Sequence, residues 1–535
     1  MGGLVSCVGL VASWRVAEAV AVSEKADGDE APARVRRSRV RPRLPLALLV
    51  AAAAVLYATY SLLRIHTFRA STYDLVIFDQ AIRSYSRFGL PVAMVKGVHN
   101  GFGPGFSILG DHFSPMLAVL APLYWIHDGP ETLVIAQAVL LALAFVPIWL
   151  YTERRLGSAA AYCVAGAYTL GWPIAEALAF DFHEVAFVPL LSALMVERHD
   201  AGRRGQAAFM AGMLLLVKED MGLLLAGFGL YLLTRRGERR AGAIHVLVGL
   251  VATWVSSRVL ISAFGGDDDY YWAYGSFGPD LPSAALHLLT HPWDAVKALG
   301  TPPMKLETMA LLVLPLLLLP LASPLTLTAV PLLAERMLAD RIPNWWEARY
   351  HYNAFLIAVL LLASVDGAVR LRRLLAGRSW PRALPRRLRR VSRLVPAVGL
   401  LVAAVVTVPY FSFGEFGDAS FYRRNERARA AAAAAALVPD GALVEAVNPL
   451  GPALSTRTRV LLWDWEPRDA PWVIADTRRR QFPFGSRDEQ IRRVEVLVAG
   501  GYRTLFQREG FIVLHRPGPE PVNIPQSDRK QVTRY

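Results

Sequence analysis

Charged and histidine side chains gather in five short stretches of an otherwise apolar chain. A carboxylate in such a stretch can take a proton from a hydroxyl group, and a carboxylate beside a histidine can transfer a proton or bind a metal ion. A lysine or an arginine can bind a phosphate group. The five stretches are Tyr73 to Ala81, His99 to Pro115, Asp181 to Glu184, Lys218 to Asp220 and Trp345 to Tyr352.

The first stretch contains two aspartates that we predict to be catalytic. Asp74, Phe78 and Ala81 have the i, i+4, i+7 spacing of a single helix face. Asp79 lies roughly 140° around an ideal helix from Asp74, so the two carboxylates cannot reach the same atom from a regular helix. Asp74 is the candidate general base, and its structural alternative is a helix N-cap.

The second stretch is rich in glycine and leads into Asp111 and His112. The glycines permit tight turns, but the Lys-Ser/Thr ending of a phosphate-binding P-loop is missing. Asp111 and His112 fit a proton-transfer pair, metal ligands or a pair that binds the substrate. Their structural alternative is the capping of the helix that follows.

The third stretch places Asp181, His183 and Glu184 within four residues. Carboxylate and imidazole groups at this spacing suit a divalent cation or a hydroxyl-rich ligand, and we predict these three residues to be metal ligands. Their structural alternative is solvation at the membrane interface.

The remaining two stretches add the positive charge that an anionic substrate requires. Lys218 can pair with a phosphate, or it can neutralise its neighbours Glu219 and Asp220. Arg349 and His351 supply further donors for an anionic headgroup. The aromatic residues around them also fit the aromatic belt of a membrane interface. We predict all five residues to bind the substrate.

Transmembrane helices must position these stretches. The chain has 535 residues, of which 54% are hydrophobic, so it is too long and too apolar for one soluble core of about 100–200 residues. Apolar stretches of about 20 residues predict spanning helices, because lipid offers the backbone no hydrogen-bond partners. We expect eleven, near residues 44–63, 131–151, 157–176, 185–197, 206–217, 221–234, 243–262, 308–322, 324–339, 352–369 and 394–411.

The arginines predict the orientation of these spans. The net charge of +14 does not indicate a nucleic-acid partner, because the arginines cluster between apolar segments as they do in cytoplasmic loops. Residues 1–43 fit a disordered, basic cytoplasmic tail better than a signal peptide. If successive spans alternate in direction from a cytoplasmic N-terminus, all the arginine-rich connections lie inside. The five stretches then lie in or beside the outer loops, the longest of which are 64–130 and 263–307. We therefore expect a multi-pass cell-membrane protein.

Residues 206–234 test this orientation. A single helix here would bury Lys218, Glu219 and Asp220 midway through the bilayer and would put its two basic ends on opposite sides. Two short helices with the three charges at an outer turn keep both basic ends inside. We predict the hairpin.

The composition changes after residue 411. Apolar runs shorten to five or six residues, and β-rich segments near 442–447, 460–463, 472–475, 502–506 and 511–515 are joined by helical stretches near 424–437 and 487–499. We predict a small extracytoplasmic α/β domain over residues 412–517. A polar tail, 518–535, follows it.

Together the motifs resemble the bacterial membrane family catalogued as domain of unknown function 2079. The resemblance covers about residues 45–517 and is carried by residues 74–80, 110–115, 180–184, 218–220 and 349–352. That family is similar in layout to the GT-C class of membrane glycosyltransferases. Those enzymes take a sugar from a polyprenyl-phosphate carrier at the outer leaflet, and they carry a catalytic aspartate in the first outer loop. Asp74 matches this position, although Leu75 follows it where the common motif has Asp-Glu.

The resemblance implies an enzyme that transfers a sugar from a polyprenyl-phosphate donor to a cell-envelope glycan or protein. Asp74 would be the base, and Lys218, Arg349 and His351 would hold the phosphate. The other motif residues would bind a divalent cation or the acceptor, and the α/β domain would help to hold the acceptor chain. Two other classes of function stay open: a transporter, and a non-catalytic protein of envelope assembly or sensing.

Overall fold

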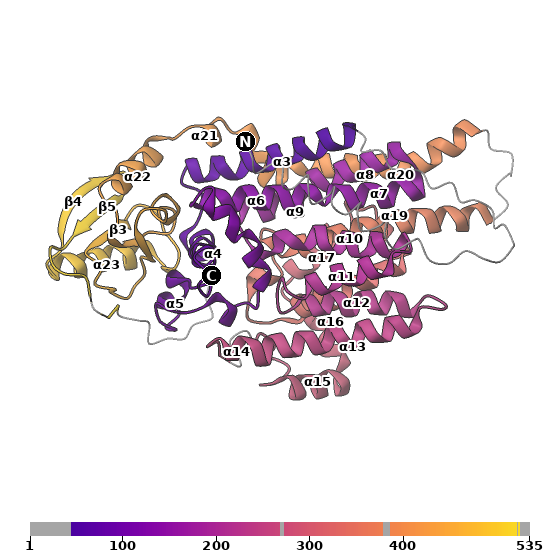
Figure 1. Cartoon of the computed structure of the whole chain (residues 1–535), viewed down its shortest axis with the longest axis horizontal. Coiled ribbons are helices and arrows are strands. Elements are labelled where there is room, and N and C mark those ends of the chain that lie inside the picture. The colour runs from indigo at the N-terminus through magenta and orange to yellow at the C-terminus, as the bar shows by residue number, and fades with distance from the viewer. Residues whose placement is uncertain (1–43, 268–271, 378–385, 522, 525–535) are drawn as a thin grey trace, which may run out of the picture. The chain divides into compact units, whose positions relative to one another are not determined.

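The chain folds into a large helical region followed by a small mixed sheet (Figure 1). The computed structural model describes residues 44–267, 272–377, 386–521 and 523–524. Several predictions fall on residues outside these ranges: the N-terminal tail 1–43, residues 268–271 of the outer loop 263–307, part of the last arginine-rich connection and most of the polar tail.

The helical region extends from residue 44 to residue 407. Its α-helices are α3 (Leu44–His66), α4 (Ile77–Ser86), α5 (Met94–His99), α6 (Pro130–Leu143), α7 (Phe145–Leu156), α8 (Ser158–Leu170), α9 (Trp172–Ala179), α10 (Val188–Asp200), α11 (Arg204–Leu214), α12 (Met221–Leu233), α13 (Arg239–Val255), α14 (Ile261–Ala263), α15 (Leu281–Thr290), α16 (Pro292–Gly300), α17 (Met304–Val313), α18 (Val330–Leu338), α19 (Ala354–Gly377) and α20 (Arg386–Thr407).

Short 3-10 and π-helical turns separate many of these helices. Those used below are the π-helix η1 (Thr72–Val76) and the 3-10 helices η3 (Pro115–Trp125), η4 (Glu184–Phe187) and η9 (His351–Asn353).

Four helical stretches in the described residues are long and apolar enough to cross a membrane: Leu44–His66, Pro130–Leu156, Arg239–Ala263 and His351–Leu375. They coincide with four of the predicted spans, namely 44–63, 131–151, 243–262 and 352–369. Six of the other predicted spans contain only shorter helices, and the last, 394–411, overlaps α20, whose apolar part is Leu394–Tyr410. In 308–322, for example, α17 ends at Val313, and Leu317 and Leu318 have left-handed φ values of 56° and 57°. The count of eleven spans stays a prediction.

The long helices differ in how deeply they are buried. The most apolar part of His351–Leu375 is 89% buried, whereas that of Arg239–Ala263 is 17% buried. A helix that is apolar all round fits either a protein interior or a lipid surface. Helix α19 therefore forms part of the core, and α13 lies at the periphery. Gly222 of α12 lets α13 approach closely, because a Cβ atom there would lie 2.2 Å from the carbonyl oxygen of Gly249.

The break predicted within residues 206–234 is confirmed. Helix α11 ends at Leu214 and α12 begins at Met221, so Lys218, Glu219 and Asp220 lie in the turn between two short helices. Helix propensity alone would allow one continuous helix here. The break removes three charged side chains from the middle of an apolar helix, where burial is costly.

The C-terminal sheet domain is also present as predicted. Its elements are α21 (Ala419–Tyr422), α22 (Glu426–Ala436), β1 (Leu443–Ala446), β2 (Arg459–Leu462), β3 (Trp472–Asp476), α23 (Arg487–Ala499), β4 (Arg503–Arg508) and β5 (Phe511–His515). The strand order is β2-β1-β3-β5-β4, in which β1 is parallel to β2 and β3, and β5 is antiparallel to β3 and β4. Every residue of the inner strand β1 is buried, including Glu445, whose carboxylate lies 3.2 Å from the guanidinium of Arg493.

The segment after α3 packs against this sheet. Val98 of α5 lies in one hydrophobic cluster with Leu443 of β1, Leu461 of β2 and Ala470. The side chain of Gln80 in α4 also donates a hydrogen bond of 3.0 Å to the carbonyl oxygen of Val460. The sheet domain thus contacts the same segment that carries Asp74.

Candidate functional site

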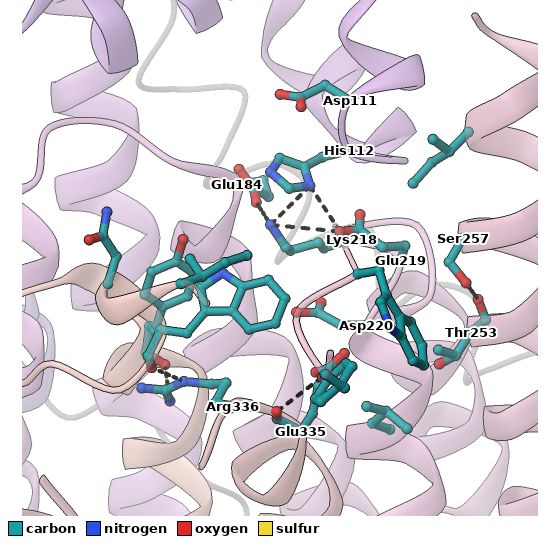
Figure 2. Close-up of a pocket in the computed structure, with 18 of the residues that line it drawn as sticks. Asp111, His112, Glu184, Lys218, Glu219, Asp220, Thr253, Ser257, Glu335 and Arg336 are labelled. Carbon is teal, nitrogen blue, oxygen red and sulfur yellow. Dashed lines mark hydrogen bonds and ion pairs between the residues drawn. The ribbon is translucent and has the colours of Figure 1, made fainter. Parts of the chain in front are cut away.

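A cavity of about 630 Å³ lies in the helical region, among η1, α12, α13, α15, α18 and η9 (Figure 2). Its wall brings together residues that are far apart in the sequence. Nine of the twelve predicted site residues line it: Asp74, Asp111, His112, His183, Glu184, Lys218, Glu219, Asp220 and His351.

Asp74 lies on the π-helix η1, at one side of the cavity. The helix N-cap is Ser71, whose hydroxyl oxygen accepts a hydrogen bond of 3.3 Å from the backbone amide of Asp74 and donates one of 2.9 Å to its carboxylate. Asp74 is therefore not itself the cap, and its carboxylate is held by a neighbouring hydroxyl. The other carboxylate oxygen of Asp74 lies 3.5 Å from Nε2 of His183.

His183 is stacked on a second histidine, His351. The ring centroids lie 4.0 Å apart and the ring planes differ by 16°. Both side chains are buried, and the Nδ1 atom of each has no hydrogen-bond partner among the described residues. A buried ring nitrogen without a partner costs free energy unless a ligand or water satisfies it. The hydrogen-bonding capacity of both Nδ1 atoms is therefore unused within the described residues.

Lys218 is the centre of a buried network of charges (Figure 2). Its Nζ atom lies 2.9 Å from Oε1 of Glu184 and 3.2 Å from Nδ1 of His112. Glu219 completes the network, with one oxygen 2.9 Å from the same His112 nitrogen. Burial alone would raise the pKa of Glu184, but Lys218 and His112 lower it to about 2. Glu184 is therefore ionised and neutralises Lys218.

A second ion pair on the wall was missed by sequence reasoning. Lys96 of α5 lies 2.9 Å from a carboxylate oxygen of Asp111, and both side chains are buried. Its Nζ atom also donates a hydrogen bond of 3.2 Å to the hydroxyl of Tyr73. The rarity of lysine in this arginine-rich chain is a signal that points to Lys96.

Asp220, Glu335 and Arg336 line another part of the cavity (Figure 2). Burial raises the pKa of Asp220 to about 7, and the neighbouring Glu219 adds to this rise while Lys218 opposes it. The guanidinium of Arg336 donates to the carbonyl oxygens of Trp345 and Tyr352, at 2.7 and 3.0 Å, and to the side chain of Asn353.

Arg336 therefore has only neutral acceptors. No carboxylate in the described part of the chain forms an ion pair with its buried guanidinium. A buried positive charge of this kind favours an anionic ligand. Sequence reasoning missed Glu335 and Arg336 because both belong to a segment predicted only as an apolar span.

The rest of the wall is apolar and aromatic. It is formed by residues of α13, α14 and α15 and by the adjoining loops, including Leu250, Trp254, Ile261, Leu281, Leu288, Trp272, Tyr274 and Trp345. Leu250 and Trp254 are half exposed, at 50% and 55%. The apolar wall of the cavity thus continues onto the outer surface of α13.

Asp79 and Arg349 are two of the three predicted residues outside the cavity lining. Asp79 is fully buried in an ion pair with Arg83, at 2.9 Å, and accepts a hydrogen bond of 2.8 Å from the hydroxyl of Tyr124. Arg349 is exposed. Sequence spacing predicted that each lies near the other motifs, but the packing of α4 on η3 and the turn before η9 direct these two side chains elsewhere.

The predicted metal ligands do not converge on one point. Asp181 has a left-handed φ of 61° and accepts a hydrogen bond of 2.7 Å from the backbone amide of Ser71. His183 faces Asp74, and Glu184 pairs with Lys218. Within the ranges that the structure describes, no group of three or more His, Cys, Asp or Glu side chains is arranged to hold a metal ion. The left-handed turn at Asp181 separates side chains that are adjacent in sequence, and the assignment of the three residues as metal ligands stays a prediction.

Comparisons with solved structures identify similar folds. The chain is similar to ArnT from Cupriavidus metallidurans bound to undecaprenyl phosphate, with a TM-score of 0.50 and 13% sequence identity over 88% of this chain and 97% of that chain. It also matches the apo oligosaccharyltransferase of Archaeoglobus fulgidus, with a TM-score of 0.41 and 13% identity over 80% of this chain and 69% of that chain.

A third match is the arabinofuranosyltransferase AftD from Mycobacteria, with a TM-score of 0.42 and 13% identity over 90% of this chain and 40% of that chain. No curated protein sequence matches the chain. The likeness to ArnT shows a shared fold, which agrees with the GT-C-like architecture predicted from the sequence.

The family model described as "Predicted membrane protein (DUF2079)" matches residues 64–513, which include the cavity and nearly all of the sheet domain. The chain belongs to this family of membrane proteins.

Proposed function

We propose that the protein is a membrane glycosyltransferase that moves a sugar from a polyprenyl-phosphate donor to a cell-envelope acceptor on the outer face of the membrane. The observation that carries this proposal is the composition of one cavity. It combines a carboxylate beside a histidine, buried cations and an apolar wall that continues onto the exposed surface of the peripheral helix α13. A charged sugar phosphate attached to a hydrocarbon chain needs all three.

The donor is matched by two kinds of surface. The buried guanidinium of Arg336 and the ammonium group of Lys218 can hold the phosphate. Leu250 and Trp254, which line the cavity and are half exposed on α13, can contact the hydrocarbon chain. Arg336 takes the place of Arg349 in this proposal, because Arg336 lines the cavity.

The proposed chemistry is a single displacement at the sugar carbon that carries the phosphate. Asp74 takes the proton of an acceptor hydroxyl as its oxygen forms a bond to that carbon. The bond between the carbon and the phosphate oxygen breaks, and the lipid phosphate leaves with the electron pair. General base catalysis of this kind contributes about 10²–10⁴-fold to the rate. The cations stabilise the charge of the leaving phosphate.

His183 supports Asp74 in this step. Its Nε2 atom is 3.5 Å from the carboxylate, and its ring is fixed by the stack with His351. Asp111, His112, Glu219 and Asp220 contribute carboxylate and imidazole groups that can bind sugar hydroxyls. No step is assigned to a divalent cation, because the three predicted ligands point to different partners.

Substitution of Asp74 tests the proposal. Purified full-length protein is incubated with a panel of radiolabelled undecaprenyl-phosphate sugars and an envelope extract as acceptor. Asp74→Asn should lower transfer by about 10²–10⁴-fold. The Asp74→Asn protein should still bind undecaprenyl phosphate, as measured by native mass spectrometry. Asp440→Asn, an exposed carboxylate of the sheet domain, is the matched control and should behave as wild type.

The same assay separates the other classes of function. A transporter would move the lipid or its sugar across proteoliposomes without a new glycosidic bond. A non-catalytic assembly protein would bind the carrier equally well with and without Asp74, and neither form would transfer a sugar. Absence of transfer from every donor by correctly folded wild-type protein would count against the enzyme.

A further inference from the structure

A loop of the sheet domain contacts the two residues that precede Asp74. The carbonyl oxygen of Asn448, just after β1, accepts hydrogen bonds from the backbone amide of Thr72 at 2.7 Å and from its hydroxyl at 2.5 Å. The side-chain oxygen of Asn448 accepts a third from the backbone amide of Tyr73, at 3.0 Å. We infer that Asn448 is a positioning residue for Asp74, an inference that rests on the proposed function.

The position of these contacts in the helix explains their effect. Backbone amides in the first turn of a helix lack partners within that helix and need capping groups. Ser71 caps the amide of Asp74 locally. Asn448 caps the amides of Thr72 and Tyr73, although it lies 375 residues after Tyr73 in the sequence. Ser71 and Asn448 therefore both fix the start of η1, and with it the direction of the Asp74 side chain.

Gly451 makes the close approach possible. Its backbone amide donates a hydrogen bond of 3.0 Å to the hydroxyl of Thr72. A Cβ atom at position 451 would lie 2.2 Å from that same hydroxyl oxygen, which is much closer than van der Waals contact allows. Thr72 is completely buried by this arrangement. The loop 448–451 fits against η1 only with glycine at its end.

Further contacts fix the loop relative to the domain. The ring of Tyr73 packs on Phe482 at 5.0 Å and on His99 at 5.4 Å between centroids. His99 in turn lies 2.8 Å from a carboxylate oxygen of Asp464, which follows β2. All these partners except His99 belong to the sheet domain. Rotation of the domain away from the helical region would therefore pull on the residue next to Asp74.

This role differs from that of a domain that only binds the acceptor. An acceptor-binding domain would affect the affinity for the acceptor and would leave the geometry of Asp74 unchanged. A positioning domain affects the chemical step, because a displacement of about 1 Å in a catalytic group can reduce the rate about 10²-fold. The two roles predict different changes in kcat and KM.

Amide hydrogen exchange tests the positioning directly and needs no substrate. The experiment uses the full-length protein and follows peptides that cover residues 72–76. Asn448→Ala removes the acceptor for the Tyr73 amide and should increase exchange in this peptide about three- to tenfold. Asn448→Asp keeps a side-chain oxygen at the same place and should exchange like wild type.

Asn425→Ala is the matched control. Asn425 caps α22 in the same domain, through a hydrogen bond of 2.8 Å to the amide of Ala428, and it is exposed. Its substitution removes a cap of the same chemistry at a distant place, so exchange in residues 72–76 should not change. Equal exchange in Asn448→Ala and wild type would overturn the inference.

The transfer assay provides the second readout. Asn448→Ala should lower kcat about tenfold or more and leave the KM for the lipid donor within about twofold, and Asn448→Asp should restore most of the lost kcat. Faster exchange with an unchanged kcat would also overturn the inference. If wild type transfers no sugar, the proposed function fails, while the exchange measurement still decides whether Asn448 orders the residues beside Asp74.

Discussion

The Nζ atom of Lys218 lies 2.9 Å from Oε1 of Glu184, and both side chains are buried beside the cavity. The two residues come from different elements, the turn between α11 and α12 and the start of η4. A buried ion pair of this kind contributes little net stability as a pair, but the loss of one partner leaves the other charge uncompensated.

The pair therefore predicts a non-additive effect on stability. Lys218→Met should lower the free energy of unfolding by about 3–5 kcal/mol, because it leaves Glu184 buried without its main cation. The double variant Lys218→Met with Glu184→Gln should recover a large part of this loss. Thermal unfolding in detergent is measured for wild type, Lys218→Met, Glu184→Gln and the double variant. Additive losses in the double variant would contradict the pairing.

Asp74 and His183 should act as one unit in turnover. His183→Ala should lower kcat roughly tenfold or more, because it removes the imidazole 3.5 Å from the Asp74 carboxylate. In the Asp74→Asn background the same change should have little additional effect. The transfer assay on wild type, both single variants and the double variant gives the coupling. Independent, multiplicative losses would show that His183 acts elsewhere.

Arg336 should determine the affinity for the donor phosphate. Arg336→Gln keeps hydrogen-bond donors but removes the charge, and it should raise the donor KM about tenfold or more, since a hydrogen bond to a charged group contributes about 1.5–3 kcal/mol. Arg336→Lys should have a smaller effect. Arg349→Gln, at an exposed position outside the cavity lining, is the comparison and should leave the donor KM nearly unchanged. A larger increase in the donor KM for Arg349→Gln than for Arg336→Gln would show that Arg349, and not Arg336, binds the phosphate.

Asp220 should make stability depend on pH. Its pKa is about 7 in the folded protein, above the ordinary value of 3.8, because of burial next to Glu219. Between these two values the folded state holds a proton that the unfolded state releases, so stability falls as the pH rises from about 4 to about 7.

Asp220→Asn cannot ionise and should remove this part of the pH dependence. The difference in Tm between variant and wild type should be largest above pH 7, in favour of the variant, and should shrink toward pH 4. Asp440→Asn serves as the control and should follow wild type throughout. A constant difference across the whole range would show that ionisation of Asp220 is not linked to folding.

Sidedness can be measured with single cysteines in a background that lacks Cys7 and Cys163. Asp440→Cys in the sheet domain should react with a membrane-impermeant maleimide in intact cells. Ala201→Cys, exposed between α10 and α11, should react only after permeabilisation. The expectation follows from the arginines next to Ala201, which favour the cytoplasmic side. Reaction of both positions in intact cells, or the reverse pattern, would refute the proposed orientation of the cavity.

Much of the architecture could be predicted from the sequence, because it depends on local composition. The apolar segments indicated a membrane protein, and the short apolar runs after residue 411 predicted the sheet domain. The charges of Lys218, Glu219 and Asp220 predicted a break between two helices. Each of these features depends on the polarity of a short segment, and this polarity can be read directly from the sequence.

The membership of the site was decided only by the tertiary structure. Lys96 and Arg336 line the cavity although no motif singled them out, whereas Asp79 and Asp181 are neighbours of cavity residues in sequence but turn toward other partners. Proximity in sequence does not specify the direction of a side chain. That direction depends on helix rotation, on a left-handed turn and on the sheet domain packed against η1, and the partners that fix it lie from four to 375 positions away in the sequence.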